Sequence, residues 1–114
     1  MNITVPHLTV EEKATLDDIK SAVARLLHER AYRLVLFGSK ARGDFDKTSD
    51  VDLAIIVDGL DRKLKDEIID AIADVELHHL FYVSTVILST DEFRHLLSRE
   101  RRVALDIQSE GIEL

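Results

Sequence analysis

The order of apolar patterns along the chain is the feature that most constrains its fold. Three short, continuous apolar runs, typical of buried strands, occupy residues 32–37, 51–57 and 80–88. Three other segments, residues 10–30, 61–77 and 90–98, carry apolar residues at helical spacing. This alternation predicts a small α/β (α+β) fold, in which a mixed β-sheet is covered by helices mainly on one face.

Local signals predict where several of these elements begin. Thr9 and Glu12 have the spacing of a capping box at the start of the first helix, and Ser89 or Thr90 is expected to cap the last one. In the middle helix, the apolar residues expected on its inner side are Leu64, Ile68, Ile69, Ile72, Ala73 and Val75. The tail, residues 103–114, is compatible with a last helical turn or with a short edge strand near Ile112.

The size and charge of the chain limit the classes of function. Its 114 residues fit one domain, residues 1–114, and it has no cysteine for a disulfide or a thiolate metal site. No apolar stretch is long enough to span a membrane, and the start has no signal-peptide pattern, so we expect a cytoplasmic protein. The net charge of −7 argues against direct nucleic-acid binding.

One polar stretch between the first two expected strands carries the candidate chemistry. The first strand ends at Gly38-Ser39, where glycine allows a tight turn and the following amides can face a phosphate. Lys40 and Arg42 add positive charge beside this turn. The sequence therefore predicts an anion-binding turn after the first strand.

Two aspartates open the second strand. Asp50 and Asp52 are two residues apart, so strand geometry places both carboxylates on one face. Carboxylates held that closely repel each other unless a cation lies between them, and Mg²⁺ prefers oxygen ligands. A phosphate-binding turn opposite a carboxylate-bound Mg²⁺ is typical of phosphoryl transfer, although each motif taken alone is also common in turns and caps.

At these residues the chain resembles the minimal nucleotidyltransferases of the DNA-polymerase-β-like superfamily, whose motif is Gly-Ser, ten residues, then Asp-x-Asp. The match continues through Ala41, Gly43, Ser49 and Leu53. The resemblance implies a polymerase-β palm-like fold, in which Gly38, Ser39, Lys40, Arg42 and Ser49 bind a nucleoside triphosphate. It implies that Asp50 and Asp52 are the catalytic and Mg²⁺-binding residues.

The resemblance also implies a partner. Small relatives act as antitoxins beside an all-helical HEPN-domain toxin, some by transferring AMP from ATP to a hydroxyl of that toxin. Active relatives usually carry a third carboxylate on the next core strand, but residues 81–88 contain no acid. Ser84 or Thr85 stands where that acid is expected, and the candidates to replace it in space are Asp44, Asp46 and Asp58.

Two functions follow from this pattern. The first is an Mg²⁺-dependent antitoxin that transfers AMP to a HEPN partner, in a homo- or hetero-oligomer; the alternative is a nucleotide-binding module that neutralises its partner by forming a complex. A transferase for a small molecule is a third option that would need a second domain.

We expect the arginines at 94, 99, 101 and 102 and the pair His78 and His79 to be surface residues, and Tyr82 to be in the core or an interface.

Overall fold

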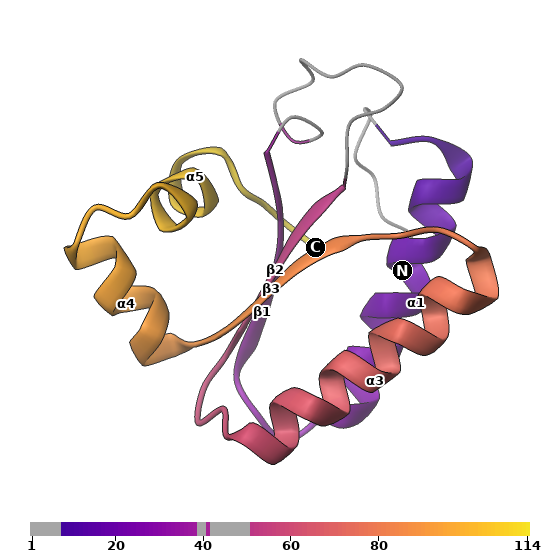
Figure 1. Ribbon diagram of the computed structural model, residues 1–114, viewed down its shortest axis with the longest axis horizontal. Helices are drawn as coiled ribbons and strands as arrows, with labels where there is room; N and C mark the ends of the chain where they lie inside the picture. The colour runs from indigo at the N-terminus through magenta and orange to yellow at the C-terminus, as the bar shows by residue number, and fades with distance from the viewer. Residues whose placement is uncertain (1–7, 39–40, 42–50) are drawn as a thin grey trace.

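A computed structural model describes residues 8–38, 41 and 51–114 (Figure 1). Its elements, in chain order, are α1 (Val10–Leu26), β1 (Tyr32–Phe37), β2 (Asp52–Val57), α3 (Arg62–His79), β3 (Ser84–Ser89), α4 (Thr90–Ser98), α5 (Arg102–Glu110) and β4 (Ile112–Glu113). The four strands form one sheet in the order β3-β2-β1-β4. β1 is antiparallel to β2 and to β4, whereas β2 and β3 are parallel, so the expected mixed sheet is confirmed.

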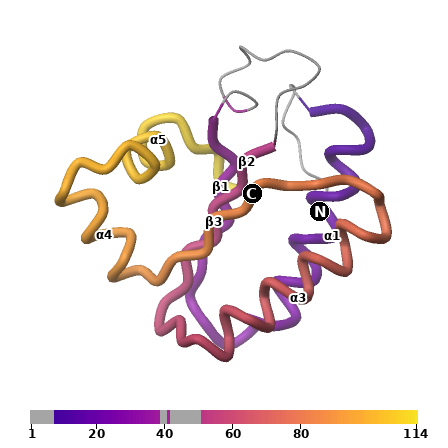
Figure 2. Tube along the Cα trace, in the orientation of Figure 1, coloured from indigo at the N-terminus to yellow at the C-terminus, as the bar shows by residue number. Residues whose placement is uncertain are grey.

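The two long helices, α1 and α3, lie together on one face of the sheet, as the traces in Figures 1 and 2 show. Alternate strand residues face this layer, because successive side chains of a strand point to opposite faces. Fully buried members of this core include Leu16 and Ile19 of α1, Leu53 of β2 and Ile68 of α3.

The nine-residue helices α4 and α5 lie on the opposite face. They bury a smaller core, whose members are Val35, Phe37, Ala54, Ile56, Phe93, Ala104 and Ile107. Since α1 and α3 contain 17 and 18 residues, most of the helical mass lies on the first face, as predicted. No helix in the described ranges is long and apolar enough to cross a membrane.

Local chemistry explains where the helices start. Thr9 and Glu12 form the predicted capping box, with Glu12 Oε1 accepting from the Thr9 amide at 2.8 Å. Ser89 and Glu92 form an equivalent box at α4, and Asp61 caps α3 by accepting from the Leu64 amide at 2.8 Å. These interactions satisfy amides that the first turn of a helix leaves unpaired.

Several predicted boundaries were wrong. α1 ends at Leu26 rather than near Arg30, because Leu27 is fully buried at the C-cap and the chain then turns toward β1. β3 begins at Ser84 rather than Leu80, because Leu80 adopts a left-handed conformation and the Val83 amide donates to Glu76 Oε2 at 2.9 Å. The tail forms both a helix, α5, and the two-residue strand β4.

The expected inner side of α3 was also partly wrong. Ile68 and Ile72 are buried and Leu64 and Val75 pack against the core, whereas Ile69 is 46% exposed and Ala73 is exposed. A helix that lies on one neighbouring helix buries a narrow stripe, so residues one position away from that stripe turn toward solvent.

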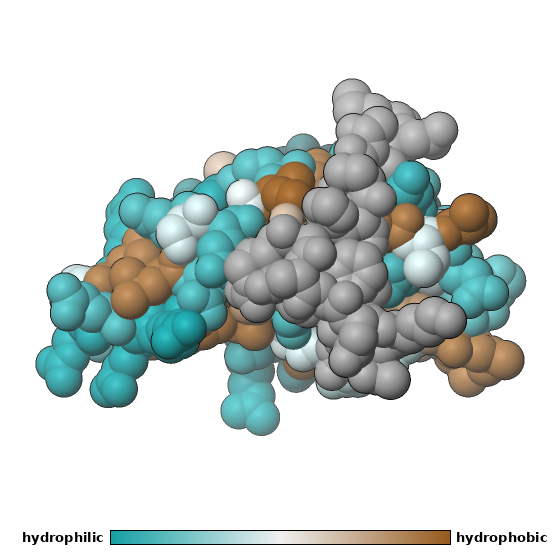
Figure 3. Space-filling view, turned by 90° about the horizontal axis from the view of Figure 1, so that it is seen from above, coloured by the Kyte–Doolittle hydropathy of each residue, from teal (hydrophilic) through white to brown (hydrophobic). Residues whose placement is uncertain are grey.

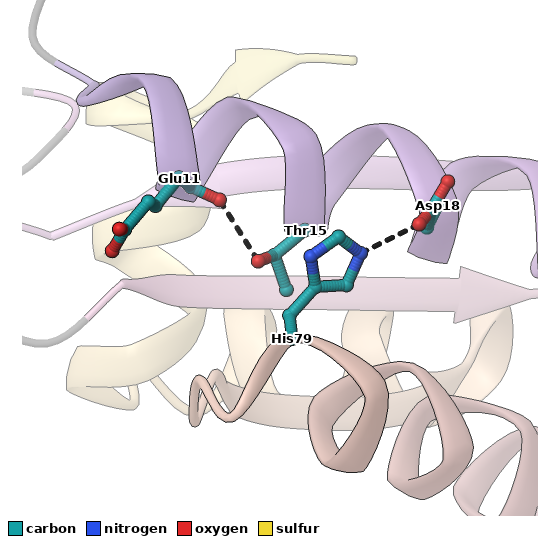
Figure 4. Close-up of polar contacts among 4 residues, drawn as sticks. All are labelled: Glu11, Thr15, Asp18 and His79. Atoms are coloured by element: carbon teal, nitrogen blue, oxygen red, sulfur yellow. Dashed lines mark hydrogen bonds and ion pairs between the residues drawn. The ribbon is translucent and has the colours of Figure 1, made fainter.

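A polar contact joins the end of α3 to the middle of α1, where the two helices run side by side (Figure 4). His79 Nε2 lies 2.6 Å from Asp18 Oδ2, and this contact holds the end of α3 that leads toward β3. Within α1, the Thr15 hydroxyl donates to the Glu11 carbonyl at 2.9 Å. Thr15 is fully buried, and this hydrogen bond satisfies its hydroxyl.

Candidate nucleotide site at the end of the sheet

The candidate site is built at one end of the sheet, where three strands meet. Gly38 directly follows β1, Asp52 is the first residue of β2, and Ser84 is the first residue of β3. The register places Phe37 opposite Asp52, and Asp52 beside Ser84. The sheet therefore brings together residues that are 46 positions apart in the chain.

Gly38 and the Asp52 carboxylate are in close contact. Gly38 has a φ of +78°, in the left-handed region that favours glycine. A Cβ atom at this position would overlap Asp52 Oδ2 and lie 3.3 Å from Cγ. Glycine is required here for two independent reasons, since it permits the backbone turn and leaves room for the carboxylate.

Ala41 lies close to Gly38. Its amide donates to the Gly38 carbonyl at 3.1 Å, and Ala41 packs against the α1/α3 core. The other predicted nucleotide- and metal-binding residues, Ser39, Lys40, Arg42, Ser49 and Asp50, lie outside the described residues. The structure thus locates Gly38 and Asp52, and the roles of the whole set stay predictions.

Ser84 is the position on β3 that faces the site. Paired residues of neighbouring strands project from the same face of a sheet, so Ser84 lies beside Asp52 on the α4/α5 side. Thr85 pairs with Leu53, a fully buried residue of the α1/α3 core, and therefore points to the other face. A hydroxyl rather than a carboxylate consequently stands next to Asp52.

Asp58 cannot replace the acid that β3 lacks. It follows the last residue of β2, and its amide donates to the Ala31 carbonyl at 3.0 Å, beyond the other end of the sheet. Asp58 is six residues after Asp52 along an extended strand, a span of roughly 20 Å. The other two candidates, Asp44 and Asp46, lie outside the described residues.

The donor chemistry at this end of the sheet fits Mg²⁺. Asp52 supplies a half-buried carboxylate, and Mg²⁺ is commonly held by one or two carboxylates together with phosphate oxygens of the substrate. Within the described ranges, no group of three or more acidic, histidine or cysteine side chains is placed to bind a metal ion. Among the described residues, Asp52 is therefore the candidate metal ligand at this end of the sheet, and Asp50 stays a predicted one.

A groove of about 420 Å³ lies away from these residues. It is lined by Ala31, Tyr32 and Arg33 at the start of β1, by Ile56, and by Thr90, Phe93, Arg94 and Leu97. Gly38 and Asp52 are at the opposite end of the same strands, so this groove is separate from the candidate site.

The remaining predicted residues lie on the surface. Arg94 is 3.9 Å from Asp91, and Arg102 is 3.3 Å from Asp106, both with largely exposed arginine side chains, as expected for solvated helix ends. His78 is exposed, whereas His79 is half-buried by its contact with Asp18. Tyr82 is 68% exposed, which excludes the core, and its alternative place in an interface stays a prediction.

Comparison with known families agrees with this geometry. The profile of the family described as "Nucleotidyltransferase domain" matches residues 16–108, which include both Gly38 and Asp52. The chain belongs to the nucleotidyltransferase domain family. The match covers all three strands that form the candidate site, as well as α3, α4 and most of α1.

This nucleotidyltransferase domain is similar to one protein in sequence and to another in structure. A Methanocaldococcus jannaschii protein named "Putative protein adenylyltransferase" is 34% identical over 73 residues, which are 63% of this chain and 74% of that protein. A crystal structure named "a putative nucleotidyltransferase" from Sulfolobus solfataricus is 15% identical, with coverage of 93% of this chain and 86% of that one and a TM-score of 0.47. Similarity at that level adds no argument about function.

Proposed function

We propose that this nucleotidyltransferase domain transfers AMP from ATP, in the presence of Mg²⁺, to a hydroxyl of a partner protein, and that it serves as the antitoxin of a HEPN-domain toxin. The observation that carries the proposal is the contact between Gly38 and the Asp52 carboxylate, in a chain of this family. The relative named as a protein adenylyltransferase supports ATP as donor and a protein as acceptor.

The chemistry assigns a separate task to each part of the site. Gly38 and the turn after it would bind the triphosphate through backbone amides, together with Ser39, Lys40, Arg42 and Ser49. Asp50 and Asp52 would hold Mg²⁺, which offsets the negative charge of the phosphates when it is bound. The α4/α5 side of the sheet end, toward which Asp52 projects, would receive the acceptor.

The transfer breaks a phosphoanhydride bond of ATP and forms a phosphoester bond to the acceptor. The acceptor hydroxyl oxygen bonds to the α-phosphorus of ATP, and the bond from that phosphorus to the oxygen that bridges to the β-phosphorus breaks. Pyrophosphate leaves, and the hydroxyl proton passes to water. This chain's part is to hold the α-phosphorus and the hydroxyl in line, because positioning and charge neutralisation provide most of the catalysis in such reactions.

Ser84 favours a second candidate function. A neutral hydroxyl beside Asp52 leaves the metal site with fewer negative charges than three carboxylates would give. The alternative is therefore a nucleotide-binding module that neutralises its toxin by forming a complex, with no transfer of AMP.

Label transfer distinguishes these functions. The purified chain would be incubated with ATP labelled at the α-phosphate, Mg²⁺ and the protein encoded by the adjacent gene. The proposal predicts a labelled partner, and loss of the label with Asp52→Asn. A partner that is inhibited without becoming labelled, equally by wild type and by Asp52→Asn, would support the binding module and reject the enzyme.

A further inference from the structure

Helix α3 carries a second apolar stripe, which faces solvent. Ile69, Ala73 and Leu77 recur every four residues, so they lie along one side of the helix, and Leu80 ends the helix three residues later. Leu77 is 73% and Leu80 is 87% exposed, and Ile69 is 46% exposed. This stripe, residues 69, 73, 77 and 80, is distinct from the buried side of α3, which contains Ile68 and Ile72.

Leu80 is unfavourable in the isolated chain. It has φ 52° and ψ 42°, the left-handed conformation in which glycine or asparagine usually ends a helix. A leucine in this conformation is strained by its Cβ atom, and its exposed side chain gains no burial in return. Neither its backbone geometry nor packing against the described residues explains a leucine here, whereas contact with another molecule would.

A line of acidic residues flanks the stripe. Asp66, Asp70 and Asp74 also recur every four residues, and all three are exposed. From residue 66 to the end of α3 at His79 the sequence contains five acidic residues and no lysine or arginine. A molecule that covers the stripe therefore meets a negative surface along one side.

We propose that the exposed side of α3 is a docking surface for a basic amphipathic helix of another protein. Aliphatic side chains of that helix would cover the stripe, and lysine or arginine would face Asp66, Asp70 and Asp74. A helix fits because the stripe follows the axis of α3, and Ala73 at its centre allows two helices to approach closely. Opposite charges across the contact give the pairing its specificity.

The position of this surface leaves the nucleotide site open. α3 lies on the α1/α3 face, and the Asp52 side chain is on the α4/α5 face. In Figure 3, hydrophobic side chains protrude at the border of the molecule on the side where α1 and α3 lie. The proposal does not depend on transfer chemistry, so it stands or falls independently of the proposed function.

Two synthetic helices test this docking surface. One peptide of about 18 residues, or five turns, carries leucine on one face and lysine on the other, and its counterpart carries glutamate in place of lysine. We expect fluorescence anisotropy to show about tenfold tighter binding of the lysine peptide to the full chain, equivalent to ~1.4 kcal/mol. Leu77→Ser and Leu80→Gly should each weaken this binding, and the double variant Asp70→Lys/Asp74→Lys should reverse the preference.

Controls separate docking from loss of structure. Leu105→Ser replaces a leucine that is 40% exposed on α5, on the other face of the sheet, and should leave binding unchanged. Leu80→Gly relieves a strained conformation, so its thermal midpoint should be at least that of wild type. Equal binding of both peptides, or binding unaffected by Leu77→Ser, would overturn the proposal. So would sedimentation as a dimer that Leu77→Ser dissociates, because the surface would then be occupied by a second copy.

Discussion

Asp52 places its carboxylate so close to Gly38 that any side chain at position 38 would overlap Oδ2. The register of β1 and β2 sets this contact, because Phe37 is paired with Asp52 and Gly38 is the next residue. The turn that is predicted to bind phosphate therefore begins directly beside the carboxylate that is predicted to bind metal.

Gly38→Ala should consequently affect both stability and activity. We expect the left-handed φ of +78° to cost about 1–2 kcal/mol of unfolding free energy with alanine, and the overlap with Asp52 to add to this. Because the carboxylate must shift, nucleotidyl transfer should fall by about 100-fold or more. Denaturant titration and label transfer measure the two effects.

Gly59→Ala is the matched control. Gly59 has a similar φ of +71° but lies beyond the other end of β2, where a Cβ would meet only the end of the flexible Arg30 side chain, 3.0 Å away. The Gly59→Ala variant should lose a similar ~1 kcal/mol of unfolding free energy and keep full transfer activity. Equal losses of activity in the two variants would show that Gly38 matters for folding alone.

Ser84→Asp should strengthen metal binding. Position 84 is paired with Asp52 on the same face of the sheet, so a carboxylate there would add an oxygen ligand and a negative charge beside Asp52. We expect the affinity for Mn²⁺, measured by paramagnetic resonance, to rise about tenfold or more, or ~1.4 kcal/mol. Ser84→Asn, similar in size but neutral, should show no such gain, and equal affinities in both variants would exclude a metal next to this position.

Leu80→Gly should stabilise the isolated chain. Leu80 and Glu100 have the same positive φ of 52°, and both are non-glycine residues. Replacing either with glycine should raise the free energy of unfolding by about 0.5–1 kcal/mol, because glycine adopts this conformation without strain. Denaturant titration of the two variants checks this prediction. If Leu80→Gly is destabilised while Glu100→Gly is stabilised, the Leu80 side chain packs within the chain.

The cap of α4 predicts a pH dependence. The hydrogen bond from the Ser89 backbone, together with that from the Ser89 side chain and the charge of Lys65, lowers the pKa of Glu92 below 4.5. The stabilisation from the Glu92 carboxylate is therefore complete above pH 4.5 and is lost as the pH falls through the lowered value. On acidification, Glu92→Gln should therefore lose about 0.5 kcal/mol less of its free energy of unfolding than wild type does. The difference is small because the residue is exposed. Identical acid unfolding curves for Glu92→Gln and wild type would contradict this effect.

Much of the fold follows from short-range patterns. The capping box at Thr9, a helix cap at Ser89 or Thr90, and strands over residues 32–37 and 51–57 were predicted because their signals lie within a few residues. These features depend on local backbone geometry, which sequence reports directly.

Other features depend on contacts between distant segments. The choice between Ser84 and Thr85 needs the register of β3 against β2, and the solvent side of α3 depends on how that helix lies on α1. The exclusion of Asp58 depends on strand direction. The spacing of residues 69, 73, 77 and 80 is a sequence signal for the exposed stripe. The same apolar character places Ile69 and Ala73 on the inner side of the helix when only the sequence is considered, so the sequence alone does not separate the two sides.

Calorimetry of ATP binding tests the central claim, that Asp52 next to Gly38 forms a metal–nucleotide site, without requiring an acceptor. Wild type and Asp52→Asn would be titrated with ATP in Mg²⁺ and again in a chelator, after circular dichroism shows that both are folded. We expect Mg²⁺-dependent binding by wild type that Asp52→Asn weakens by about tenfold or more. Equal binding of ATP and Mg²⁺ by the two proteins would show that Asp52 is not part of such a site.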